Sequence, residues 1–161
     1  MNRMVMEALV AVLTKYPMKP GEKIPWVYEK VADEKRQLPF FSWHISVPHQ
    51  RILWKQVNGE FYTKTIQVKI HAADPLEAND RIEWMQNILN SMQPQLDLAQ
   101  KGISVISVSD PEPLDEDWTI SIENQVGTNV RLMVNSNYHD NTQSGEIAAV
   151  EPNYTIKKEE S

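Results

Sequence analysis

The chain has 161 residues, a hydrophobic fraction of 41%, five Trp and a formal net charge of −6. This length and composition predict one globular domain with its own hydrophobic core. The absence of Cys excludes disulfides and thiolate metal sites, and the acidic balance argues against a protein that reads nucleic-acid sequence.

The first segment predicts an amphipathic helix. Apolar residues recur there at helical spacing and form one stripe: Val5, Ala8, Leu9, Val12, Leu13 and Tyr16. Glu7 interrupts the apolar stretch and no small-residue cleavage site precedes Pro17, so we expect a helix of the mature protein and not a signal peptide. No apolar run approaches the roughly 20 residues that a membrane-spanning helix needs.

Residues 17–37 predict a polar connector, because its Pro and Gly residues oppose regular structure. One short strand is expected within it, at Trp26–Tyr28. A longer strand is predicted over residues 39–47, which are rich in aromatic and β-branched types. Pro48 then predicts a break in the ladder, a bulge or a sheet edge.

A long β-hairpin is predicted next, turning at Asn58-Gly59, because a two-residue type I′ turn favours this dipeptide. Its arms cover about residues 51–57 and 60–72. The register of such a turn sets Trp54 opposite Thr63 and Ile52 opposite Thr65.

The second arm alternates, with Ile66, Val68 and Ile70 expected in the core. The intervening residues, His71 among them, are expected on a solvated face. Near the turn, apolar residues occupy both faces, so either the hairpin folds over its own domain or it packs on a neighbouring subunit. The second alternative makes a set of hairpin residues the candidate subunit interface: Arg51, Ile52, Leu53, Trp54, Val57 and Tyr62.

Asp74, Pro75 and Glu77 predict the start of a second helix, with an N-cap, Pro at the first position and a capping box. Its predicted buried stripe consists of Ala78, Ile82, Met85, Leu89 and Met92. Pro94 is expected to end or kink this helix, and Gly102 to close a further turn.

The remaining sequence predicts strands at Ile103–Val108, 118–122 and 130–134, with a turn or bulge at 125–128. Residues 110–117 form an acidic loop, residues 135–145 a polar loop, and 147–156 a possible last strand. We expect a single α+β domain over 1–156 and a frayed tail over 157–161. It should consist of a mostly antiparallel sheet of four to six strands, two main helices packed on it and a projecting β-hairpin.

No cluster in the sequence predicts catalysis. The four His residues, at positions 44, 49, 71 and 139, lack zinc-ligand spacing, and there is no Gly-rich phosphate loop or nucleophile elbow. We therefore expect no catalytic residue, no metal and no cofactor. The weakest alternative is a small metal-binding enzyme domain that uses His71 with Asp74, or His44 with His49.

The order of the predicted elements, together with several local motifs, resembles the tail or neck terminator proteins of long-tailed bacteriophages, of the type found in phages and prophages of Gram-positive bacteria. The resemblance covers roughly residues 1–138. The motifs that carry it are Leu38-Pro39-Phe40-Phe41, Gln67-Val68-Lys69-Ile70, Ala73-Asp74-Pro75, Ala78-Asn79-Asp80 and Ile122-Glu123-Asn124-Gln125-Val126-Gly127.

This resemblance implies a virion structural protein that forms a homo-oligomeric ring, usually of six copies. Such a ring caps the tail tube, presents a surface to the head–tail connector protein and lets DNA pass through. It implies assembly in the host cytoplasm and a final location in the virion tail or neck, without a membrane. Another head–tail connector or adaptor protein remains the alternative within the same class.

Overall fold

The computed structural model describes residues 2–29, 37–53, 58–113 and 124–136. These residues form three helices and six strands. The helices are α1 (Asn2–Lys15), α2 (Pro75–Leu89) and α3 (Met92–Ala99). The strands are β1 (Trp26–Tyr28), β2 (Phe40–Arg51), β3 (Phe61–Ala72), β4 (Ile103–Val108), β5 (Glu112–Pro113) and β6 (Asn124–Asn135).

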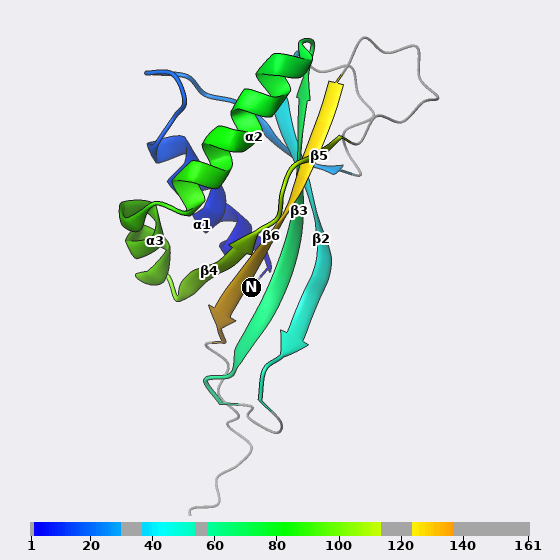
Figure 1. Ribbon diagram of the computed structural model, residues 1–161. Coiled ribbons are helices and arrows are strands. Elements are labelled where there is room, and N and C mark those ends of the chain that lie inside the picture. The colour runs from blue at the N-terminus through cyan, green and yellow to red at the C-terminus, as the bar shows by residue number, and fades with distance from the viewer. Residues whose placement is uncertain (1, 30–36, 54–57, 114–123, 137–161) are drawn as a thin grey trace, which may run out of the picture.

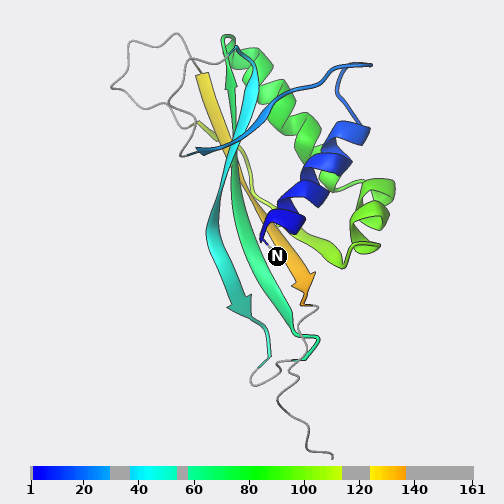
Figure 2. The ribbon, with the colours of Figure 1, turned by 180° about the vertical axis from the view of Figure 1, so that it is seen from behind.

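The sheet has the strand order β1-β2-β3-β6-β4, and the short β5 pairs with β6. The pairing of β1 with β2 is parallel and every other pairing is antiparallel. All three helices lie on one face of the sheet (Figures 1 and 2). The predicted α+β class is confirmed, with α3 joining the two expected helices on the mixed, mostly antiparallel sheet.

The first helix has the predicted buried stripe. Val5, Ala8, Leu9, Val12 and Leu13 are all buried, and their spacing turns one apolar side toward the sheet. Two polar contacts then fix the end of α1 against α3, because Lys15 Nζ and Tyr16 Oη both donate to Asp97 Oδ2, at 2.6 and 2.9 Å.

The second helix begins as predicted but ends earlier. Asp74 is its N-cap and accepts a hydrogen bond from the backbone N–H of Leu76 at 3.0 Å. Helix α2 stops at Leu89, and Pro94 lies inside the separate helix α3. Met92 is therefore not the last residue of the buried stripe, and its exposed fraction is 78%.

The predicted capping box is also wrong in its second half. Glu77 Oε1 accepts hydrogen bonds from the guanidinium of Arg81, one turn later in the helix. A charged donor on the same helical face offers this carboxylate a stronger bond than a backbone N–H does.

The hairpin of β2 and β3 is present, but its register differs from the predicted one. Thr63 lies opposite Gln50 instead of Trp54, and Thr65 lies opposite Val47 instead of Ile52. Strand β2 runs without a break through Pro48, with register shifts on both sides of Val47. These irregularities lie where β2 has passed the end of β1, in agreement with the bulge or edge that Pro48 predicts.

The last described strand is continuous. Residues 125–128, predicted as a turn or bulge, lie within β6 and pair in register with β3. Pairing with the long strand β3, and with β5 at Val126 and Gly127, outweighs the local turn preference of Gly127 in this strand. The strand predicted at 118–122, most of the polar loop predicted at 135–145 and the strand predicted at 147–156 lie outside the described residues.

The core lies between the helices and one face of the sheet. Alternation along β3 turns Ile66, Val68 and Ile70 toward the helices, as predicted, and all three are fully buried. Their main partners on the other elements are Val5, Leu9, Leu13, Phe41, Ile82, Met85, Leu89, Leu98, Val130 and Leu132. This core holds the helix-covered part of β2 and β3 in place, and the rest of the hairpin extends beyond it.

Candidate interaction surface

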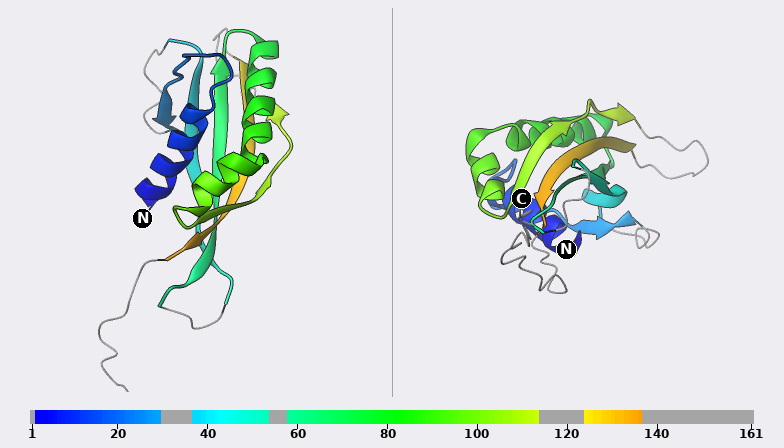
Figure 3. Two further views of the ribbon diagram at one scale, coloured as in Figure 1. Left: turned by 90° about the vertical axis from the view of Figure 1, so that its left-hand side faces the viewer. Right: turned by 90° about the horizontal axis from the view of Figure 1, so that it is seen from below.

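The end of the β2–β3 hairpin extends past the helical layer (Figure 1 and Figure 3, left). Its outermost described residues include large apolar side chains that no described part of the chain covers. Ile52, Leu53 and Phe61 are 48%, 54% and 42% exposed. We call these three residues the hairpin end.

The hairpin end is held by a polar cluster directly behind it. The Glu60 carboxylate is buried, and its Oε1 lies 3.3 Å from His49 Nε2 and 3.2 Å from Arg51 Nε. The His49 ring stacks on Tyr62 with centroids 4.1 Å apart. Because one carboxylate holds cationic or donor groups from β2, the two strands stay joined up to their last residues.

Three of the six predicted interface residues belong to this exposed region. Arg51, Ile52 and Leu53 are exposed, and Trp54 and Val57 lie outside the described residues. Tyr62 differs, because its side chain is only 1% exposed and belongs to the core. In the observed register, Tyr62 faces the helices, as does Ile66 four residues later on β3. Its side chain therefore offers no surface to a partner.

A second apolar surface lies between α1 and the start of β2. A groove of about 520 Å³ is lined there by Met6, Val10, Ala11, Trp26 and Trp43, with Arg3 and Glu7 at its rim. Packing holds both indole rings in place. Trp26 stacks on Phe41 at a centroid distance of 4.4 Å, and Trp43 meets the edge of Tyr28 at 4.9 Å. We call this the tryptophan groove.

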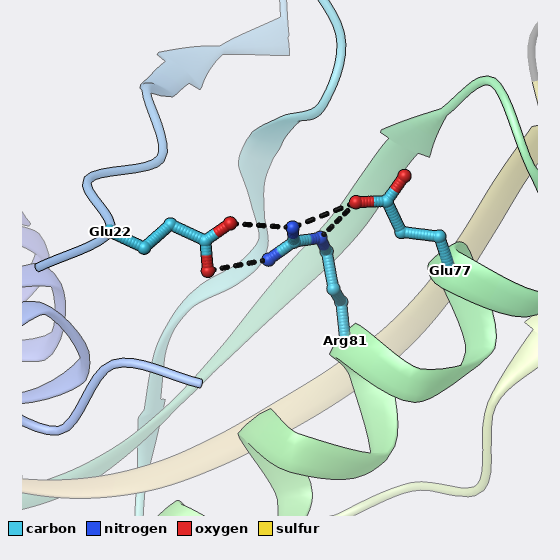
Figure 4. A network of polar contacts seen from close by, with 3 residues as sticks. All are labelled: Glu22, Glu77 and Arg81. Carbon is cyan, nitrogen blue, oxygen red and sulfur yellow. Dashed lines mark hydrogen bonds and ion pairs between the residues drawn. The ribbon is translucent and has the colours of Figure 1, made fainter. Parts of the chain in front are cut away.

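The position of Trp26 depends on an ion cluster that fixes the preceding connector. Arg81 on α2 is only 2% exposed and donates to two carboxylates (Figure 4). Its Nη atoms donate to Glu22 at 2.7 and 3.2 Å, and its Nε and one Nη donate to Glu77 at 3.1 and 2.8 Å. Hydrogen bonding to Arg81 lowers the pKa of Glu22. The paired geometry therefore anchors the connector to α2, four residues before β1 begins.

Sequence reasoning did not find this cluster. The Glu77–Arg81 spacing of four residues is a visible signal for a helical ion pair. Nothing in the sequence links either residue to Glu22, which lies 59 positions away from Arg81. Only the packing of the connector against α2 brings the three residues together.

The three described His residues, His44, His49 and His71, each contact a neighbouring side chain. His71 is buried, against the prediction of a solvated position, with its ring stacked on Phe40 and its Nε2 2.7 Å from Ser42 Oγ. Ser42 is itself 0% exposed, so this Ser–His pair offers no accessible hydroxyl for nucleophilic attack. His44 Nδ1 contacts the Glu29 carboxylate, which also binds Lys69.

Neither a metal-binding group nor a membrane-spanning helix is present among the described residues. Within residues 2–29, 37–53, 58–113 and 124–136, no three His, Asp or Glu side chains gather into a group that could hold a metal ion. No described helix has the length and apolar character to cross a membrane. His139 lies outside the described residues.

Compared with models of known protein families and with curated protein sequences, the chain matches none.

Proposed function

We propose that this protein is a virion structural protein, the tail or neck terminator of a long-tailed bacteriophage or prophage. It acts as a homo-oligomeric ring that caps the tail tube and provides the surface to which the head-side connector attaches. The observation that carries the proposal is the hairpin end. A stiff hairpin that presents Ile52, Leu53 and Phe61 to solvent is typical of a surface that another subunit covers.

Two further observations support this proposal. The element order and motifs of the sequence resemble tail terminators. The elements occur in the order that the resemblance predicts: the N-terminal helix, then the long hairpin, then the helix that follows β3. The net charge of −6 suits a ring through which DNA passes without being held, because an acidic wall repels the phosphate backbone.

Deletion of the gene from the phage or prophage tests this proposal. We expect abnormally long tails, or completed tails that do not join heads, when virions are examined by electron microscopy. Virions of normal tail length and normal infectivity would contradict it. Gene order separates a terminator from another connector protein, because a terminator gene should lie directly before the gene of the major tail tube protein.

A further inference from the structure

The hairpin end and the tryptophan groove are complementary surfaces that cannot meet within one molecule. Both lie along the same strand, since Trp43 lines the groove and Arg51 ends β2 eight residues later. At about 3.3 Å per strand residue, the two points are roughly 25 Å apart on one stiff strand. The hairpin end extends beyond the N-terminus of α1 (Figures 1 and 2).

We infer that the hairpin end of one copy of this chain docks in the tryptophan groove of the next copy. This inference depends on the proposed ring and names the two surfaces that would join its subunits. Ile52 and Leu53 supply branched apolar side chains, and the groove supplies Met6, Val10 and two indoles that each pack on a neighbouring aromatic ring. Large aromatic side chains that are already held in place bind apolar partners without a further loss of side-chain entropy.

The charges around the two surfaces are also complementary. Arg51 lies immediately before Ile52. Its Nε pairs with Glu60 Oε1 at 3.2 Å, but its side chain is 59% exposed and its guanidinium has four further N–H donors. Glu7 lies at the rim of the groove, and its pairing with Arg3 is a solvent-exposed i,i+4 contact. Such exposed pairs contribute little to stability, so Glu7 can accept Arg51 of an incoming copy.

The geometry favours a second copy over an unrelated partner, because each surface is the chemical complement of the other and every copy carries both. Contacts between two different surfaces are heterologous, and they produce rings when the rotation closes. A face-to-face dimer through two hairpin ends would instead leave both tryptophan grooves uncovered.

The lack of Cys in the natural chain permits a direct crosslinking test. A Leu53→Cys variant is mixed with an Ala11→Cys variant, since Ala11 is an exposed residue that lines the groove. Under mild oxidation we expect a disulfide-linked heterodimer, several-fold above the yield from Leu53→Cys mixed with Gln67→Cys. Gln67 is a half-buried residue on the face of the sheet that carries no helix, and it serves as the control position outside the groove.

The Leu53→Cys, Ala11→Cys double variant extends the test to the whole assembly. Head-to-tail docking predicts a ladder of crosslinked species that ends at the size of the ring, measured by denaturing gel and native mass spectrometry. Equal yields with Ala11→Cys and Gln67→Cys would overturn the inference.

Failure of the inference and failure of the proposed function give different results. Rings in native mass spectra without a Leu53–Ala11 crosslink would overturn the docking site and leave the ring in place. A crosslinked ladder from a protein whose gene deletion leaves virions normal would support the docking site and overturn the virion role. A protein that stays monomeric at high concentration and gives no crosslink would overturn the docking site.

Discussion

At the residue scale, the charged side chains that affect folding stability most are the two that are buried, Arg81 and Lys64. Arg81 is buried and satisfied by two carboxylates, whereas Lys64 is buried against neutral groups. The two residues therefore have opposite effects on stability, and single substitutions can separate them.

Replacing Arg81 with Ala should lower the free energy of unfolding by about 3 kcal/mol, because two carboxylates lose their shared partner and a cavity remains. Thermal and urea unfolding measure this loss. The Arg81→Met variant is the control for packing, since it keeps most of the volume without the charge. An Arg81→Ala variant as stable as the natural chain would contradict the anchoring role of the cluster.

The same cluster predicts a pH dependence. The folded protein lowers the pKa of Glu22 below its ordinary value of 4.5, through hydrogen bonds from Arg81. The stabilisation that comes from the Glu22–Arg81 interaction is therefore fully present above about pH 4.5, and it is lost as the pH falls through the lowered pKa of Glu22. We expect the stability difference between the natural chain and Arg81→Met to shrink with acidification over that range.

Lys64 predicts the opposite response to substitution. Its side chain is 1% exposed on the helix-covered face, where its Nζ binds Asn2 Oδ1 and lies 5.7 Å from the Tyr62 ring centroid. Burial lowers the pKa of Lys64, because no described carboxylate compensates the charge.

Lys64→Met should therefore raise the free energy of unfolding, by on the order of 1 kcal/mol. In the natural chain, the lowered pKa makes the unfolded state bind more protons, so stability should rise as the pH increases toward the ordinary Lys pKa. Thermal unfolding at neutral and alkaline pH measures both effects. A variant less stable than the natural chain would indicate that the Asn2 contact outweighs the desolvation of the charge.

At the element scale, local sequence signals decide where helices begin, and tertiary pairing decides how strands align. The start of α2 depends on Asp74, whose carboxylate accepts from the N–H of Leu76. The register of β2 against β3 depends instead on which residues face the helices, and the Asn58-Gly59 turn did not predict it.

The Asp74→Ala substitution should lower the free energy of unfolding by about 1 kcal/mol, because an N-cap carboxylate is replaced by a side chain with no hydrogen-bond acceptor. Asp74→Asn is the matched control, since its side-chain oxygen can still cap the helix, and it should lose much less. Chemical denaturation of the three proteins compares these values. Equal losses for both variants would show that the charge at the helix N-terminus, and not the cap hydrogen bond, is responsible.

At the scale of the whole molecule, the hairpin end and the tryptophan groove are the two surfaces that we propose to be buried between copies of the chain. Association that buries these surfaces should stabilise the folded state by mass action. The melting temperature is then expected to rise with protein concentration.

Leu53→Asp should remove this concentration dependence and weaken the oligomer in native mass spectra. Its effect on the free energy of unfolding at low concentration should stay within about 0.5 kcal/mol, because Leu53 is 54% exposed. Leu76→Asp is the matched control, an equal change at a position 69% exposed on α2 and outside both surfaces. An equal loss of oligomer in both variants would contradict a specific role of the hairpin end.

The sequence by itself determined the α+β class, the stripe of α1, the N-cap of α2, the short strand β1 and the alternation of β3. Each of these depends on neighbours within a few residues, where helical or strand period and capping chemistry act. Ile52 and Leu53 are exposed, and their assignment to a subunit interface stays a prediction.

Only the tertiary structure decided the remaining features. The hairpin register, the continuity of β6, the burial of Tyr62 and His71 and the Arg81 cluster all arise between segments far apart in the chain. Their free energies depend on which faces pack together, and such pairings leave no local periodic signal in the sequence. For the same reason the tryptophan groove, built from α1, β1 and β2, became visible only once those elements were packed together.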